Sequence, residues 1–227
     1  MILTSCLPYE HFNMNKNFTI IILSWLACLT ASVAKPVKVV CFGDSITKGG
    51  YPAIVGETLG VEIVNSGVGG HSSSQAMRRF QKDVLDHKPD IVVVFFGTND
   101  LRVDSERVHT PVDKYVKNLK EIITRCRKLG SKVVLCTPPP IDAKIYHTRH
   151  DKATYDKHGG LEALLKSYAD AARTTAKDEK TALVDLNQLL LNEPTWMRKD
   201  GVHPSHAGKS IIAKYVSDAI KPLLPTK

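Results

Sequence analysis

The feature that most constrains the fold is the alternation of short apolar runs with longer segments of helical spacing. The runs are rich in Val, Ile and Leu and have the length of buried strands. They are Val37–Phe42, Val61–Val64, Ile91–Phe96, Lys132–Cys136 and Ala182–Val184. Strands that alternate with helices are joined by right-handed crossovers, so this order predicts a parallel sheet with helices on both faces.

Helices are expected where apolar residues recur with a helical period. These segments are Ser74–Leu85, Pro111–Leu129, Leu161–Ala176 and His206–Ile220. Gly130 follows the second segment as a helix stop. The pattern therefore predicts an α/β fold with three layers.

The amino terminus has the pattern of a secretory signal peptide. Lys16 precedes an apolar stretch, Phe18–Leu29, and small residues follow it up to Ala34. We therefore expect residues 1–34 to be a signal peptide cleaved near Ala34, and residues 35–227 to form one domain of a secreted or periplasmic protein. The apolar stretch is short for a bilayer, so no stable membrane span is expected in the mature form.

Alternatives remain for this leader. It could be retained as an uncleaved anchor, and Cys28 raises the possibility of a lipoprotein, although Trp25–Ala27 is a poor lipidation signal. Met14 would begin a more ordinary signal peptide than Met1, because the first residues contain Glu10 and no basic residue.

The formal net charge of +8 invites a nucleic-acid-binding interpretation. The basic residues are scattered, however, mostly on expected helix faces, and no aromatic residues are interleaved with them. Arg78–Arg79 and Arg125–Lys128 are examples. A solvated basic surface is favoured, and no nucleic-acid partner is expected.

Cys41, Cys126 and Cys136 are too few for a disulfide framework, and the sequence selects no pair for a single bridge.

Polar clusters follow four of the apolar runs. They are Gly43–Ser45, Asn65–Ser72, Gly97–Asp100 and Thr137–Pro140. In a parallel sheet the carboxyl ends of the strands share one edge, where ligands bind. We therefore expect the four clusters to converge on one rim.

Ser45 is the candidate nucleophile. A serine hydroxyl needs a base to take its proton, and an imidazole oriented by a carboxylate commonly does so. Asp200 and His203 lie three residues apart and can present both groups in one turn. Without them, Ser45 would be interpreted as a turn or cap residue.

Acyl transfer also needs hydrogen-bond donors for the developing oxyanion. The candidates are the backbone amides of Ser45 and Gly70 and the side-chain amide of Asn99. Gly67–Gly70 could instead be a flexible connection, and Asn99 an Asx-turn residue. No lysine follows the glycines in the position that a phosphate-binding loop requires.

Four blocks of the sequence resemble those of the SGNH hydrolases, also called GDSL esterases and lipases. They are Phe42–Ser45, Asn65–Gly70, Gly97–Asp100 and Asp200–Pro204, in the family's order. The resemblance implies a three-layer α/β/α sandwich with a five-stranded parallel sheet, of flavodoxin-like type. It also implies that Ser45 is the nucleophile, His203 the base, Asp200 its orienting partner, and Ser45, Gly70 and Asn99 the oxyanion hole.

The expected activity is hydrolysis of carboxylic esters through an acyl-enzyme, which requires no metal and no organic cofactor. Loops set the substrate, and neither Leu101–Thr110 nor Ile141–His158 is rich in large apolar residues. We therefore expect a short acyl group, most simply acetyl, on a carbohydrate or another small-molecule ester. A lysophospholipase or acyl-thioesterase is the alternative enzyme.

Ile141–His158 is the longest stretch expected to be irregular, and its side chains could form a polar, aromatic wall for a sugar. It could also be a solvated loop, or its histidines 147, 150 and 158 could bind a metal, although no cysteine or carboxylate cluster accompanies them.

A non-catalytic glycan-binding protein on a hydrolase scaffold is a further alternative. The complete set of Ser45, Asp200 and His203 argues against that alternative.

Overall fold

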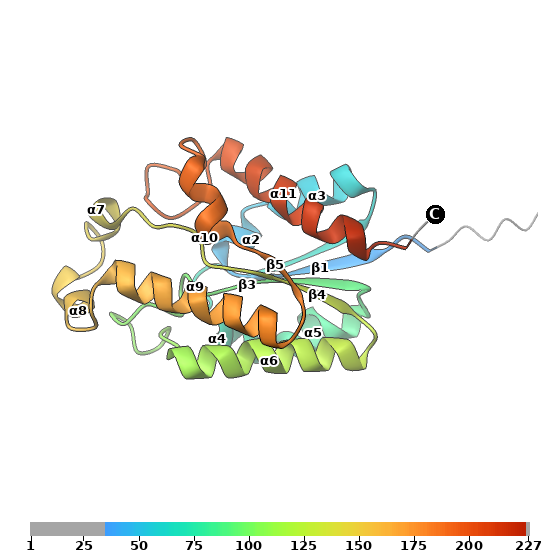
Figure 1. Cartoon of the computed structure of the whole chain (residues 1–227), viewed down its shortest axis with the longest axis horizontal. Coiled ribbons are helices and arrows are strands. Elements are labelled where there is room, and N and C mark those ends of the chain that lie inside the picture. The colour runs from blue at the N-terminus through green and yellow to red at the C-terminus, as the bar shows by residue number, and fades with distance from the viewer. Residues whose placement is uncertain (1–34, 226–227) are drawn as a thin grey trace, which may run out of the picture. The chain divides into compact units, whose positions relative to one another are not determined.

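A twisted sheet of five parallel strands forms the centre of the protein (Figure 1). The computed structural model describes residues 35–225. The strands are β1 (Lys38–Gly43), β2 (Glu62–Gly67), β3 (Ile91–Phe95), β4 (Lys132–Cys136) and β5 (Ala182–Val184). Their order is β2-β1-β3-β4-β5. The predicted α/β sheet is therefore confirmed, including its number of strands.

Helices cover both faces of the sheet (Figure 1). They are α2 (Ser45–Lys48), α3 (Tyr51–Leu59), α4 (Ser73–Met77), α5 (Phe80–Asp83), α6 (Val112–Lys128), α7 (Ala143–Tyr146), α8 (Lys152–Asp156), α9 (Leu161–Asp178), α10 (Leu186–Leu189) and α11 (His206–Ile220). Three 3₁₀ helices are described as well: η1 (Leu85–His87), η2 (Leu190–Asn192) and η3 (Lys221–Leu223).

Alternate residues of the strands enter two separate cores. Val40 and Phe42 of β1 point to the face that α6 and α9 cover, whereas Val39 and Cys41 point to the face that α3 and α11 cover. Because successive side chains of a strand point to opposite faces, a strand buried on both sides must be apolar throughout. This explains the continuous apolar runs of the sequence.

Two predicted segments differ from the structure. The single helix expected at Ser74–Leu85 is divided into α4, α5 and η1, because the chain turns at Arg78–Arg79. The stretch Ile141–His158 is not wholly irregular: Asp142 and Asp151 cap α7 and α8 by accepting hydrogen bonds from backbone amides of their first turns. Helix α3 was not predicted, and Gly50, Pro52 and Gly56 obscured it.

The position of the site follows from the strand order. The chain leaves β1 toward β2 on one side and returns to β3 on the other. The carboxyl ends of β1 and β3 therefore flank a topological switch point, where loops diverge and leave a crevice. Ser45 follows β1 and Asn99 follows β3.

The described residues also bear on two further expectations, the cysteines and the absence of a membrane span. Cys41, Cys126 and Cys136 are buried free thiols, so no disulfide joins them. None of the helices between residues 35 and 225 is long and apolar enough to cross a bilayer. The expected signal peptide, residues 1–34, lies outside the described residues.

Candidate active site

Ser45 and His203 are brought together from opposite ends of the domain. Ser45 Oγ lies 2.9 Å from His203 Nε2, and His203 Nδ1 lies 3.1 Å from Asp200 Oδ2. Ser45 is half-buried, and both other side chains keep partial access to solvent. The three residues predicted from the sequence thus form one continuous hydrogen-bonded chain.

The turn after β1 positions the serine. Asp44 accepts a hydrogen bond from the Ile46 amide through Oδ1 at 2.8 Å and so begins α2 at Ser45. Gly43 is required here, because a Cβ at this position would lie 2.7 Å from the Phe95 carbonyl oxygen. The strand therefore ends in a turn that presents the hydroxyl at the edge of the sheet.

The turn Asp200–His203 positions the imidazole. Asp200 Oδ1 accepts hydrogen bonds from the Val202 amide at 3.0 Å and from the His203 amide at 2.9 Å, which leaves Oδ2 for the ring. Gly201 has φ +77, a left-handed conformation that favours glycine. Burial alone would raise the pKa of Asp200, but the two amides and His203 outweigh it and lower that pKa. Asp200 is therefore held as a carboxylate.

The predicted oxyanion donors lie beside the serine. Gly70 and Asn99 line the same pocket of about 320 Å³ as Ser45 and His203. Asn99 Nδ2 also lies 3.2 Å from both Asp44 Oδ2 and the His71 carbonyl oxygen, so the amide is fixed by the β1 turn and the loop after β2. An oxygen of a bound ligand would share the Asn99 Nδ2 donor with the Asp44 carboxyl group and the His71 carbonyl oxygen.

The buried carboxyl groups of Asp44 and Asp100 stabilise the turns that follow β1 and β3. Burial, with a contribution from Asp100, raises the pKa of Asp44 to about 7. Burial raises the pKa of Asp100 to about 6. Asp100 accepts hydrogen bonds from the Ser73 amide and hydroxyl and from the Gly97 amide. It thereby joins the start of α4 to the loop after β3.

Arg79 has a role that the sequence did not reveal. It was expected on a solvated helix face, but its guanidinium donates to the carbonyl oxygens of Gly43 and Ser66 at 2.9 and 2.8 Å. It also pairs with Asp83 and lies over the Phe42 ring. Through these contacts Arg79 connects the turn before Ser45 to the end of β2.

The stretch Ile141–His158 forms part of the pocket wall. Tyr146, Arg149 and His150 line the pocket together with Val202. Tyr146 and His150 stack with ring centroids 4.0 Å apart, and Arg149 donates to the Asp200 carbonyl oxygen. The interpretation as a polar, aromatic wall is therefore favoured over that of a solvated loop.

Other expected contributions are not found. Thr137–Pro140 does not line the pocket: Thr137 bonds to Asp185, and Pro138 lies close to Gly97. Three of the four clusters therefore converge, not all four.

Within residues 35–225 no group of three or more potential ligands is arranged to hold a metal ion. His150 instead bonds to Asp104.

Asp104 fixes the wall from the opposite loop. Its carboxylate contacts Arg102 at 3.3 Å, His150 at 2.7 Å and the Tyr155 hydroxyl at 2.8 Å. Burial opposes its ionisation, but these partners outweigh burial and lower the pKa of Asp104 to about 2. The charged form of Asp104 therefore stabilises the folded state.

We expect Asp104→Asn to lower the free energy of unfolding by about 1–2 kcal/mol at pH 7, after allowance for partial exposure. The folded-state pKa of Asp104 lies below the ordinary value, so its contribution is present above about pH 4 and is lost as the pH falls toward about 2. Urea unfolding of both proteins at pH 7 and near pH 3 measures this. The difference in unfolding free energy between wild type and Asp104→Asn should shrink at the lower pH. Asp178→Asn is the control, because Asp178 is exposed at the end of α9. A difference independent of pH would contradict the assignment.

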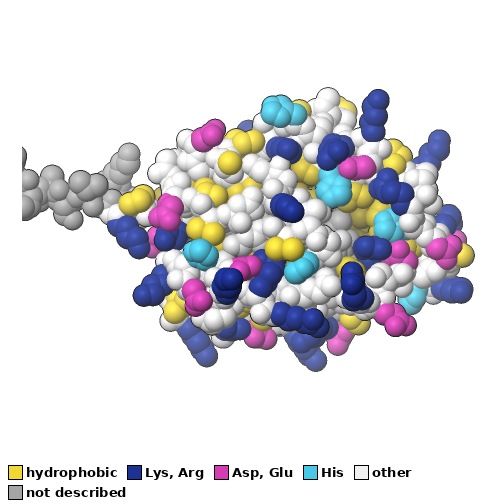
Figure 2. Space-filling model, turned by 180° about the vertical axis from the view of Figure 1, so that it is seen from behind, with side chains coloured by type: hydrophobic (Ala, Val, Ile, Leu, Met, Phe, Trp, Pro, Cys, Tyr) yellow, Lys and Arg dark blue, Asp and Glu magenta, His cyan; other side chains and the backbone are white. Residues whose placement is uncertain are grey.

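One face of the described residues bears on the nucleic-acid interpretation. On the face shown in Figure 2, Lys and Arg are spread among Asp and Glu. This distribution is typical of a solvated surface rather than of a nucleic-acid-binding groove.

Comparisons with known proteins agree with this geometry. The model of the GDSL-like Lipase/Acylhydrolase family matches residues 41–211. An uncharacterized lipoprotein, YqeF of Bacillus subtilis, is 34% identical over 168 residues, which cover 65% of this chain and 69% of that protein. An acetylxylan esterase of Geobacillus stearothermophilus is 27% identical over 161 residues, covering 69% and 70%.

A solved structure is similar as well. The acetyl xylan esterase AlAXEase superimposes with a TM-score of 0.68 at 30% identity, over 81% of this chain and all (100%) of that one. The match of the family model extends over most of the chain and includes Ser45, Asp200 and His203. The chain therefore belongs to the GDSL-like lipase and acylhydrolase family and is a carboxylic ester hydrolase.

Proposed function

We propose that this protein is an exported esterase that removes short acyl groups, most simply acetyl, from carbohydrates by a Ser-His-Asp mechanism. The observation that carries the mechanism is the 2.9 Å contact of Ser45 Oγ with His203 Nε2, with Asp200 on the other ring nitrogen. In this mechanism His203 takes the serine proton as Ser45 attacks the ester carbonyl. The amides of Ser45, Gly70 and Asn99 stabilise the oxyanion.

The second half of the reaction uses the same groups. His203 donates its proton to the leaving alcohol, and the acyl group stays on Ser45 Oγ. Water then replaces the alcohol, gives a proton to His203 and attacks the acyl carbonyl. His203 returns this proton to Ser45 Oγ as the bond between the acyl group and Oγ breaks, which releases the acid and restores the serine.

The pocket supports a short acyl group on a polar alcohol. At about 320 Å³ it is small, and Thr98, Asn99, Arg102, Arg149 and His150 contribute polar groups to its lining. A long lipid chain would need an extended apolar groove. Relatives named as acetylxylan esterases support the acetyl assignment, and they and the lipoprotein relative support export.

A chain-length series tests the acyl specificity. With 4-nitrophenyl esters, we expect kcat/KM to be highest for acetate and to fall by at least about tenfold at octanoate, because each further methylene must be accommodated in a pocket of only about 320 Å³. A maximum at octanoate or longer would contradict the acetyl assignment and favour the lysophospholipase or thioesterase alternative.

A further inference from the structure

A second cavity adjoins the pocket that holds Ser45. Its volume is about 490 Å³, and it is lined by Gly69, Gly70, His71, Gln75, Arg78, Arg102, Arg107 and Val108. Gly70 and Arg102 line both cavities. The two cavities are therefore neighbours at Gly70, and we call the second one the arginine cavity.

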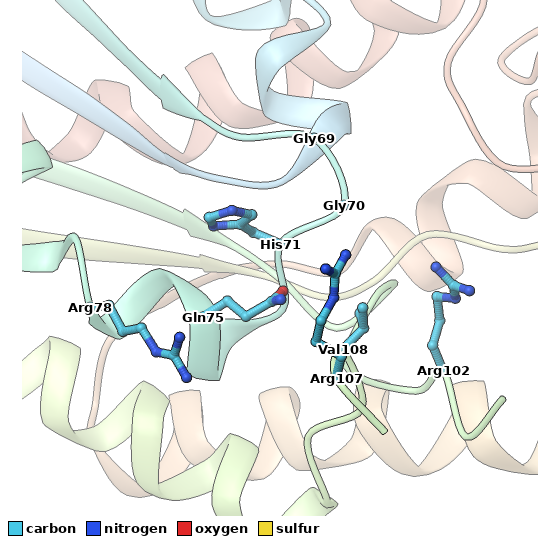
Figure 3. A pocket seen from close by; sticks show the side chains of 8 residues that line it. All are labelled: Gly69, Gly70, His71, Gln75, Arg78, Arg102, Arg107 and Val108. Atoms are coloured by element: carbon cyan, nitrogen blue, oxygen red, sulfur yellow. The ribbon is translucent and has the colours of Figure 1, made fainter. Parts of the chain in front are cut away.

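The lining of the arginine cavity carries positive charge and no carboxylate. Arg102 pairs with Asp104, so its charge is partly neutralised. Arg78 and Arg107 are exposed and form no ion pair within residues 35–225. Figure 3 shows that Arg78 comes from the end of α4 and Arg107 from the loop after β3, so two separate segments supply the unpaired charge.

The neutral side chains of the cavity also offer donors. Gln75 Oε1 accepts a hydrogen bond from the Ser72 amide at 3.0 Å, so its remaining polar group is the Nε2 amide, which donates. His71 Nδ1 accepts from Arg79 Nε at 3.3 Å, which places the ring proton on Nε2. Burial and the Arg79 charge lower the pKa of His71 and favour this neutral form.

These groups match an anionic ligand group. Arginine donors bind carboxylate and sulfate oxygens through paired N–H groups, and additional neutral donors complete such a site. A neutral sugar hydroxyl would gain less from this lining, because it needs acceptors as well as donors.

The position of the cavity assigns the anion to one part of the substrate. An acetyl group ends two carbons from the ester oxygen and cannot extend past Gly70. We propose that the arginine cavity binds an anionic group on the alcohol part of the substrate, which is therefore an acylated acidic saccharide. This proposal rests on the proposed function and adds the charge of the saccharide to it.

The test compares two acetyl esters that differ at one carbon. They are the acetylated methyl glycosides of glucuronic acid, which carries a carboxylate, and of glucose, which carries a hydroxymethyl group. We expect kcat/KM to be about tenfold or more higher for the acidic ester, the range of a charge-assisted hydrogen bond. The preference should decrease as NaCl is raised, because the arginines are exposed. A 6-sulfated glucoside determines whether carboxylate or sulfate is the preferred anion.

Substitution of the unpaired arginines tests the assignment of the cavity. We expect the double variant Arg78→Gln, Arg107→Gln to bring the ratio of kcat/KM for the acidic over the neutral ester toward one, mainly through KM for the acidic ester. The matched control is Lys177→Gln, Lys180→Gln, which removes equal charge from the end of α9 and the residues after it and should keep the ratio. Because the ratio is measured within one protein, a general loss of activity does not alter it. Arg107→Gln alone serves if the double variant folds poorly.

The outcomes separate the two proposals. Absence of hydrolysis of 4-nitrophenyl acetate by the wild-type protein would overturn the proposed function. Hydrolysis with an acidic-to-neutral ratio near one, or with a ratio that the arginine variants do not change, would overturn the cavity proposal alone. A lysophospholipid hydrolysed faster than both acetylated sugars would show that the anion recognised is not on a saccharide.

Discussion

Replacement of Ser45 by alanine is expected to lower kcat for 4-nitrophenyl acetate by about 10⁴-fold to 10⁶-fold. The substitution removes the hydroxyl that His203 contacts at 2.9 Å, and the rest of the pocket remains to bind the ester. Steady-state kinetics with purified protein, alongside thermal unfolding, measures the effect. Ser210→Ala is the control, because Ser210 is exposed on α11. Retention of more than about a tenth of the wild-type kcat would exclude Ser45 as the nucleophile.

Replacement of Asp200 by asparagine is expected to lower kcat by about 10⁴-fold with little loss of stability. The asparagine side chain can keep its oxygen on the amides of Val202 and His203, where Asp200 Oδ1 now accepts. Its NH₂ group would then face His203 Nδ1, which would have to accept a hydrogen bond. The ring proton would move to Nε2, the atom that must accept the proton of Ser45.

The matched control for that change is Asp156→Asn. Asp156 is exposed, and among residues 35–225 it pairs only with Lys152 on α8, so the activity of this variant should stay within about twofold of wild type. An Asp200→Asn enzyme with near wild-type kcat would show that another group orients His203, and the assignment of the Asp200 carboxylate would fail.

The fold could be predicted because local signals and tertiary structure agree. The β4 and β5 strands begin and end where the apolar runs do, since the covered part of a parallel strand is apolar on both faces. Helix α3 was missed because Gly56 lowers the helical signal. A Cβ there would lie 2.7 Å from Ile63 Cγ1, so packing against β2 requires the glycine.

The central residues of the site could also be predicted, because short motifs follow the strands. Ser45, Gly70, Asn99 and His203 all line one pocket. The supporting residues could not be predicted. Asp104 contacts residues of a loop more than forty positions away, and no local pattern records such long-range contacts.

Arg78 and Arg79 are neighbours in the sequence but point to different parts of the protein. The sequence presents them as one basic pair, but in the structure they have different roles. Arg79 is directed inward, onto the carbonyl oxygens of Gly43 and Ser66. Arg78 lines the arginine cavity. The turn between α4 and α5 separates the two side chains, and helical periodicity did not predict that turn.

The most direct test of the proposed mechanism is covalent labelling with a fluorophosphonate, followed by peptide mass spectrometry. A serine that His203 activates should attack the phosphorus and expel fluoride, which gives one adduct per chain on the peptide that contains Ser45. The adduct should form far more slowly in Asp200→Asn. An active protein that carries no adduct on Ser45 after prolonged exposure would contradict the account.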